Sequence, residues 1–452
     1  MATPESEAAI ERFQTFLRFE TISLTGPSTG EYVKCAEFLR AEMESICNNG
    51  QHLLQDIHFL PEVPDHSPVV VARWPGKDQT LPILLLNSHY DVVPADVEAW
   101  TVPPFGAERS PDGKLYGRGT QDMKCVCMQY IEAIRRIHEA NPEWQPERDI
   151  FLTFVPDEET GGAGMAGFLD SDLYKNRIPG IALALDEGLA STTNVFDVFY
   201  GERLPWWITV SSMGPTGHGS RFIENTAVEQ LLELTTKAMA FRKGQRDQLQ
   251  MKHTENCTHA VVAKNKTTLG DVTSLNITTL EAGMRVGGSY AYNVIPSIAT
   301  CSLDIRISPK MRPIEMKNML ETWCQECSKA PEEGSRVTWR TALGEKLATS
   351  HSTTDTDRKI NPWYGTFCDA LEEMGCEVSP QVFPAATDSR FLRALGIRAL
   401  GFSPMRNTEI MLHEHDEYIL EENFLEGIDI YVGIIRALGS ETKNIDLQTD
   451  NS

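Results

Sequence analysis

The sequence is poor in positive charge. Its 41 lysines and arginines stand against 64 aspartates and glutamates, which gives a formal net charge of -23. A chain this acidic repels nucleic acids and anionic membrane surfaces, so we expect neither as a partner. No apolar run is long enough to span a bilayer, and the first residues lack the basic and then apolar order of a signal peptide. We therefore expect a cytoplasmic protein.

A disulfide framework is also missing, because the ten cysteines are scattered along the chain. Cys324 and Cys327 form a CxxC pair within a helical pattern, but no second ligand pair lies nearby, so we expect reduced thiols there. No Gly-x-Ser-x-Gly elbow follows a predicted strand, which disfavours a serine hydrolase. The 452 residues, of which 41% are hydrophobic and 23% charged, suffice for two globular domains.

The most informative segment is a strand that ends in an imidazole and a carboxylate. The apolar run at residues 83–86 predicts a strand buried on both faces of a sheet. His89 and Asp91 follow it, and alternation along an extended chain places both side chains on the same side. His89 can therefore bind a metal ion through one ring nitrogen while Asp91 orients the other. Taken alone, the pattern also fits an ordinary strand end, because short His/Asp spacings are common.

Other carboxylates stand at the ends of predicted elements. Asp122 comes just before a predicted helix at residues 123–139, where it would be either the helix N-cap or a metal ligand. A buried strand predicted at residues 149–156 delivers three adjacent carboxylates at residues 157–159. These repel one another unless they are solvated or a cation compensates them. Acidic turns are usually solvated, yet this one follows a buried strand, where α/β active sites form.

Two further segments add candidates. A predicted strand ends in Asp186 and Glu187, and a short apolar run near the C-terminus leads into His413 and His415. Mixed histidine and carboxylate ligation suits zinc, and a shared carboxylate can bridge two ions. Spacing alone does not decide which member of either pair would be the ligand.

Six ordered blocks carry a resemblance to a known family; they are residues 87–94, 119–124, 154–159, 185–188, 292–296 and 413–417. In these blocks the chain resembles the M20 family of dinuclear-zinc amidohydrolases and metallopeptidases. The resemblance implies a zinc-exopeptidase-like α/β catalytic domain, with a mixed central sheet flanked by helices. It also implies zinc-dependent hydrolysis of the amide bond of N-acyl-L-amino acids, which releases a carboxylate and a free L-amino acid. The alternatives are a dipeptidase or carboxypeptidase of the same family and a metal-binding regulator without turnover.

The resemblance also implies a ligand set. Two zinc ions per chain would be held by His89, Asp122, Glu159, Glu187 and His413. His89 and Glu187 would bind one ion, Glu159 and His413 the other, and Asp122 would bridge the two. We prefer Glu187 to Asp186 because Glu187 aligns with the family's ligand carboxylate. We prefer His413 because of the family's His-x-x-x-Glu spacing.

Further roles come from the same resemblance. Glu158 would be the general base, and Asp91 would orient His89. Arg390 could hold the substrate carboxylate through two parallel hydrogen bonds, with a surface salt bridge as the alternative. His218 is flanked by glycines, so we expect it to be exposed rather than part of a core. In the family, a histidine at this position reaches the active site of the partner subunit and stabilises the tetrahedral oxyanion.

The middle of the chain predicts a separate, inserted domain at residues 203–345. Its elements follow in the order βαββαβ, which is ferredoxin-like. The catalytic domain would then comprise residues 1–202 and 346–440, and residues 441–452 would form an acidic tail.

The inserted domain would also be the dimerisation and lid domain. The resemblance implies a homodimer built through it, with Asn293 and Arg306 as contacts of a small N-acyl amino acid substrate. The stretch at residues 251–271 is longer than is usual for the family and predicts a surface loop.

Overall fold

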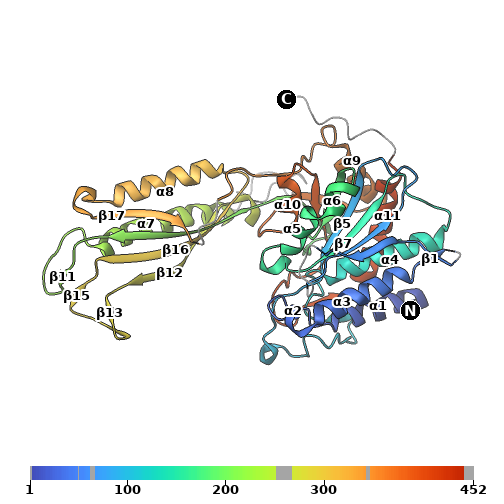
Figure 1. Cartoon of the computed structure of the whole chain (residues 1–452), viewed down its shortest axis with the longest axis horizontal. Helices are drawn as coiled ribbons and strands as arrows, with labels where there is room; N and C mark the ends of the chain where they lie inside the picture. The colour runs from blue at the N-terminus through green and yellow to red at the C-terminus, as the bar shows by residue number, and fades with distance from the viewer. Residues whose placement is uncertain (1–2, 49, 62–66, 251–266, 343–346, 442–452) are drawn as a thin grey trace, which may run out of the picture. The chain divides into compact units, whose positions relative to one another are not determined.

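The computed structural model of the chain describes residues 3–48, 50–61, 67–250, 267–342 and 347–441. The chain forms two compact units, both drawn in Figure 1. The first unit comprises residues 1–200, 354–380 and 387–452, and the inserted unit comprises residues 201–353 and 381–386. Among the described residues, no helix is both long and apolar enough to cross a membrane.

An eight-stranded mixed sheet forms the centre of the first unit, in the order β18-β9-β19-β8-β5-β7-β4-β3. Its strands are β3 (Gln55–Phe59), β4 (Val70–Trp74), β5 (Ile83–His89), β7 (Ile150–Val155), β8 (Ile181–Asp186), β9 (Val195–Glu202), β18 (Glu377–Phe383) and β19 (Ala399–Gly401). β5 pairs in parallel with β7 and β8, whereas β3, β4 and β9 pair antiparallel with a neighbour. The carboxyl ends of β5, β7 and β8 therefore meet at one edge of the sheet.

Helices cover both faces of this sheet because its central strands are apolar on both faces. Along β5, Leu84 and Leu86 face one core, and Ile83 and Leu85 face another. The first core includes α1 (Pro4–Leu17), α3 (Glu31–Glu44), α4 (Lys124–Ala140), α9 (Pro362–Glu373) and α11 (Glu421–Gly439). The second core includes α5 (Ala163–Asp170), α6 (Asp172–Arg177) and α10 (Ser389–Ala394). The mixed α/β architecture expected from the sequence is thus confirmed.

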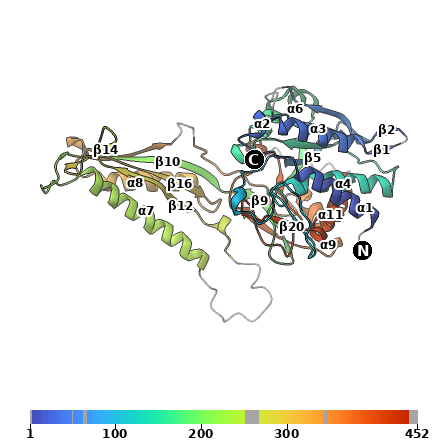
Figure 2. The same cartoon turned by 90° about the horizontal axis from the view of Figure 1, so that it is seen from below.

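The inserted unit is built on a four-stranded antiparallel sheet in the order β12-β16-β10-β17. Its elements are β10 (Leu204–Met213), α7 (Ala227–Gln250), β12 (Ser274–Ala282), β16 (Ile298–Ile307), α8 (Pro313–Cys327) and β17 (Arg336–Thr341). α7 and α8 pack into one core with the sheet and contact each other, so they cover the same face of it; both are labelled in Figure 2. Chain order and strand order together give the expected ferredoxin-like topology.

The unit boundaries differ from those we expected. The inserted unit runs to residue 353 rather than 345, and it also takes in residues 381–386. The reason is a buried arginine, Arg203, whose Nε donates to the backbone oxygen of Pro384 at 2.7 Å. Gly270 packs so closely against Val382 that a Cβ there would lie 2.0 Å from its carbonyl oxygen. Most of the expected 251–271 loop and of the 441–452 tail lies outside the described residues.

Candidate metal centre

The centre begins at the carboxyl end of β5. His89 is the last residue of this fully buried strand, and its side chain is 1% exposed. Its Nε2 lies 3.1 Å from Oδ1 of Asp122 and 3.5 Å from Oε2 of Glu187. Glu187 directly follows β8, the parallel neighbour of β5, so the sheet itself brings these two groups together.

Asp122 lies between two histidines. One carboxylate oxygen faces His89, and the other, Oδ2, lies 3.4 Å from Nε2 of His413. The same His413 nitrogen lies 3.1 Å from Oε2 of Glu159. Asp122 does not cap α4, because that helix begins at Lys124 after Met123 and has no side-chain cap. Its carboxylate is free to face both histidines, as a bridging ligand must.

The donor set fits a divalent cation. One ligand atom from each of His89, Glu158 and Glu187 lies within 4.8 Å of the others, and the same holds for His89, Asp122 and Glu159. Oε1 of Glu159 is buried without a hydrogen-bond partner among the described residues. Imidazole nitrogens and carboxylate oxygens without sulfur are ligands suited to zinc and other divalent ions.

The electrostatics of the centre point the same way. Burial raises the pKa of Glu158, Glu159 and Glu187, and in each case a neighbouring carboxylate adds to the rise. Hydrogen bonds with Asp122 and Glu159 raise the pKa of His413 to about 10. The ionised carboxylates are therefore stable only next to positive charge, which protonated histidines or a bound cation would supply.

The structure shows which member of each pair faces the centre, a choice that the spacing in sequence left open. Asp186 is turned away, since its oxygens accept hydrogen bonds from Nδ2 of Asn87 at 2.9 Å and Oγ of Ser389 at 2.7 Å. Glu187 alone of this pair faces His89. At the other pair, His413 and not His415 contacts Asp122 and Glu159 among the described residues.

Asp91 performs a task that the sequence did not indicate. Its Oδ1 and Oδ2 accept the backbone N–H groups of Glu158 and Glu159, at 3.2 and 3.3 Å. Nδ1 of His89 lies 3.0 Å from the backbone oxygen of Asp91 and 3.5 Å from its carboxylate. Asp91 therefore orients the histidine mainly through its carbonyl, and its carboxylate holds the turn that carries Glu158.

Two further buried acids were not assigned from the sequence. Glu417 accepts hydrogen bonds from Arg118 Nη1 at 2.8 Å and from the backbone N–H groups of Gly119 and Gln121, so it fixes the loop that precedes Asp122. Its His-x-x-x-Glu spacing was the available signal. Asp388 is 1% exposed, and neither of its oxygens has a hydrogen-bond partner within the described ranges. Burial, followed by repulsion from Asp186, raises the pKa of Asp388 to about 8.

Arg390 lies on α10 and forms no ion pair with any described residue. Its Nη2 donates to the backbone oxygen of Gly161 at 2.8 Å, and its guanidinium lies 4.7 Å from the ring centroid of Phe391. The described part of the chain therefore offers no partner for the salt-bridge alternative. The remaining donors of its guanidinium suit a carboxylate from outside the chain.

The other predicted residues belong to the inserted unit. His218 is exposed on the two-residue strand β11 (Gly217–His218), and its Nδ1 lies 2.8 Å from Oγ of Ser220. The backbone oxygen of Asn293 accepts the N–H of Gly219 at 2.7 Å, so Asn293 lies beside this strand. Arg306, on β16, pairs with Asp304 at 2.8 Å. The roles of these three residues stay predictions.

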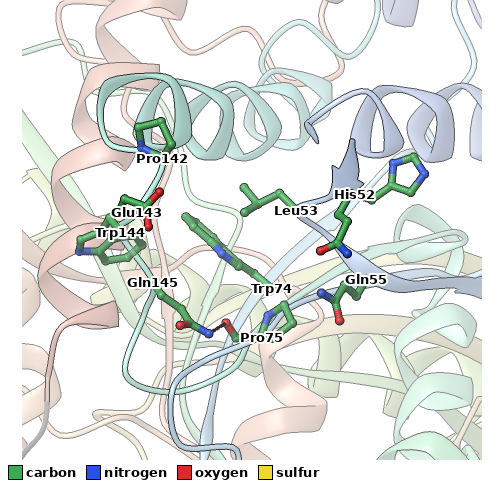
Figure 3. A pocket seen from close by; sticks show the side chains of 10 residues that line it. His52, Leu53, Gln55, Trp74, Pro75, Pro142, Glu143, Trp144 and Gln145 are labelled. Atoms are coloured by element: carbon green, nitrogen blue, oxygen red, sulfur yellow. Dashed lines mark hydrogen bonds between the residues drawn. The ribbon is translucent and has the colours of Figure 1, made fainter. Parts of the chain in front are cut away.

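A separate hollow lies elsewhere in the first unit. Figure 3 shows this cavity of about 300 Å³, lined by residues 51–53, 55, 74, 75 and 142–145. Trp74 and Trp144 form part of its wall, with ring centroids 5.2 Å apart. None of the predicted site residues lines it. It brings no cluster of metal ligands together, so the centre at the end of β5 is the site that fits the predicted chemistry.

Comparisons with known proteins bear on the same region. Residues 85–437 match the family described as Peptidase family M20/M25/M40. Aminoacylase-1 of Mus musculus is 40% identical over 439 residues, which cover 97% of this chain and 97% of that protein. Aminoacylase-1 of Dictyostelium discoideum is 43% identical over 373 residues, which cover 82% of this chain and 85% of that protein.

A solved structure shares the fold. The YXEP protein of Bacillus subtilis, described as a dinuclear metal binding peptidase from the M20 family, superposes with a TM-score of 0.61. The sequences are 13% identical, and the match covers 96% of this chain and 98% of that one.

Proposed function

We propose that this chain, which belongs to peptidase family M20/M25/M40, is an N-acyl-L-amino-acid amidohydrolase. It hydrolyses the amide bond of an N-acyl-L-amino acid in a metal-dependent reaction and releases a carboxylate and a free L-amino acid. The observation that carries this proposal is the position of Asp122 between two histidine–carboxylate pairs, with Glu158 beside one of them. The aminoacylase-1 relatives, similar over nearly the whole length, support this choice of substrate.

The metal is zinc, with two ions per chain. His89 and Glu187 would hold one ion, Glu159 and His413 would hold the other, and Asp122 would be shared between them. When bound, such ions polarise the amide carbonyl and make water acidic enough to react near neutral pH. Mixed nitrogen and oxygen ligands support zinc over softer metals.

Glu158 is the general base. It accepts a proton from the attacking water as the new C–O bond forms, and it delivers that proton to the leaving nitrogen as the C–N bond breaks. Its buried setting favours the protonated form, which helps it to hold the proton between these steps. Asp91 fixes the turn on which Glu158 stands.

The remaining residues bind the substrate. Arg390 holds the substrate carboxylate, which agrees with its lack of an ion-pair partner in the described chain. The protein is a cytoplasmic homodimer assembled through the inserted unit, and His218 of one subunit stabilises the oxyanion formed in the other. Asn293 and Arg306 contribute further substrate contacts.

A substrate panel tests the proposal. Purified protein is assayed with N-acyl-L-amino acids and with dipeptides, before and after chelation and after zinc is restored, and its metal content is measured. We expect two zinc ions per chain, preference for N-acyl-L-amino acids, and loss of activity on chelation that zinc reverses. A tenfold preference for dipeptides would identify a dipeptidase instead, and absence of turnover with both metals bound would identify a regulator.

A further inference from the structure

We propose that Tyr32 is a positioning residue for Glu158, and that residues 21–32 form a strap that holds the catalytic turn from outside the recognised family region. The proposal rests on the role given above to Glu158. Tyr32 lies on α3, and the family match covers only residues 85–437. Nothing in the six sequence blocks points to it.

The strap is bound to the segment that follows His89. Oγ1 of Thr21 donates to the backbone oxygen of Tyr90 at 2.6 Å, and the N–H of Val92 donates to the backbone oxygen of Thr21 at 2.9 Å. Ser23 donates both its N–H and its hydroxyl to the backbone oxygen of Val92, at 3.0 and 2.9 Å. Residues 21–23 therefore run alongside the chain on either side of Asp91, and they hold it through four hydrogen bonds.

The ring of Tyr32 is fixed by its neighbours. Its side chain is fully buried, and it meets the ring of Tyr90 edge-on, with centroids 5.2 Å apart at 83°. On the other side it lies against Gly26, where an added Cβ would come within 2.2 Å of the ring. Glycine is required there because the strap and the ring approach so closely. Figure 1 shows that α2 (Gly26–Thr29) leads directly into α3.

From this position the hydroxyl of Tyr32 donates to Oδ1 of Asp157 at 3.2 Å. Asp157 precedes Glu158 and has a φ of 62°, in the left-handed region that a residue with a Cβ enters at a cost. It is also close enough to Asp91 for the two carboxylates to repel. The Tyr32 hydroxyl offsets this repulsion with a donor, so it stabilises the conformation that aims Glu158.

The turn is thus held on two sides. Asp91 accepts the N–H groups of Glu158 and Glu159, and Tyr32 holds the side chain of Asp157. The strap contacts the surroundings of both Asp91 and Tyr32. Residues 21–23 bind the backbone on either side of Asp91, and Gly26 packs against the ring of Tyr32. A residue that positions the base in this way should affect turnover more than substrate affinity.

The test compares Tyr32→Phe with Tyr431→Phe, a matched control. Tyr431 also donates a buried hydroxyl hydrogen bond within the first unit, to the backbone oxygen of Phe402 at 2.7 Å. We expect Tyr32→Phe to lower kcat on the order of tenfold, with KM within about twofold and metal content unchanged. Hydrogen exchange should become faster in peptides covering residues 156–162. The control should change neither kcat nor exchange in these peptides.

A double-mutant cycle with Asp157→Ala makes the result decisive. Each single change should lower kcat, and the pair should lower it no further than Asp157→Ala alone, because both remove the same hydrogen bond. Additive losses, or a Tyr32→Phe variant that keeps more than half of its kcat and shows wild-type exchange at 156–162, would overturn the proposal. If the wild type cleaves no N-acyl-L-amino acid, the proposed function fails, and the exchange experiment still decides the role of Tyr32.

Discussion

The two units present their functional groups in opposite ways. In the first unit, His89, Glu159 and Glu187 stand at or just after the ends of parallel strands, and two loops add Asp122 and His413. These groups face one another: His89 faces Asp122 and Glu187, while His413 faces Asp122 and Glu159. In the inserted unit, His218 stands exposed on a two-residue strand, and among the described residues its ring forms hydrogen bonds only with Ser220.

This difference indicates which part of the proposed reaction each unit performs. The first unit organises charge before any substrate arrives. His89, Asp122 and Glu187 are buried, and the half-exposed His413 is held by Asp122 and Glu159. The inserted unit offers His218, a donor that forms no ion pair with any residue that the structure describes. A donor of this kind contributes to catalysis only when another surface brings the developing charge to it, which is the physical basis for placing His218 in a partner's site.

The largest expected effect comes from the buried side of the comparison. Glu158→Gln removes the proton acceptor at nearly constant size, so kcat should fall on the order of a hundred- to ten-thousand-fold. Metal content should stay at the wild-type value, because Glu158 is not one of the proposed ligands. Steady-state kinetics and metal analysis on the same preparation check both statements. A near-wild-type rate with both ions bound would show that another group is the base.

His218→Ala tests the exposed side. Loss of an oxyanion donor should lower kcat on the order of a hundredfold, with metal content unchanged. The His218→Ala chain lacks the donor but keeps the base, and the Glu158→Gln chain has the reverse defect. Mixed under conditions of subunit exchange, they should regain activity, up to about one working site per heterodimer. Verified heterodimers that stay as inactive as their parents would mean that His218 does not act across subunits.

Arg390→Lys has a smaller effect and bears on substrate binding. Lysine keeps the charge but loses the planar fork that binds a carboxylate with two hydrogen bonds, so KM should rise about tenfold with a smaller change in kcat. The control is a substrate analogue, an N-acyl amine that lacks the carboxylate. Its kcat/KM should be equal for the two proteins, and an equal loss on both substrates would argue against carboxylate recognition.

Asp388→Asn should have the smallest effect on catalysis, and its main effect should be on the free energy of unfolding. Burial and the nearby Asp186 raise the pKa of this carboxyl to about 8 in the folded protein, whereas the unfolded chain ionises near the ordinary aspartate pKa of 3.8. The free energy of unfolding of the wild type therefore falls, relative to that of the amide variant, as pH rises from about 4 to 8. We expect the free energy of unfolding of the variant, relative to that of the wild type, to rise from pH 5 to pH 8 by up to about 4 kcal/mol, since the linkage slope is about 1.4 kcal/mol per pH unit.

Thermal unfolding at the two pH values measures this gain. Asp197→Asn is the matched control, because burial raises the pKa of Asp197 only to about 6. Its gain should therefore stop growing above about pH 6. A gain for Asp388→Asn that does not depend on pH would mean that the buried carboxyl is ionised throughout.

Much of this protein is determined by its sequence alone. The apolar run before His89 predicted a strand buried on both faces of a sheet, and the order of elements between residues 203 and 345 predicted a ferredoxin-like unit. Both are present. Such features follow from the periodicity of apolar residues, which is a local property. The candidate ligands were recognisable for a related reason, since each was expected after an apolar run or before a helix; in the structure His413 lies in a loop.

Only the tertiary structure decided between neighbours at those ends. Alternation stops being a guide once a strand has ended, so spacing could not separate Asp186 from Glu187. The choice depends on Asn87 and Ser389, which lie 99 and 203 residues away from Asp186 in sequence and occupy its two oxygens. Tyr32 was not predictable for the same reason, because the one hydrogen bond that its hydroxyl forms with a described residue is to Asp157, 125 residues further along the chain.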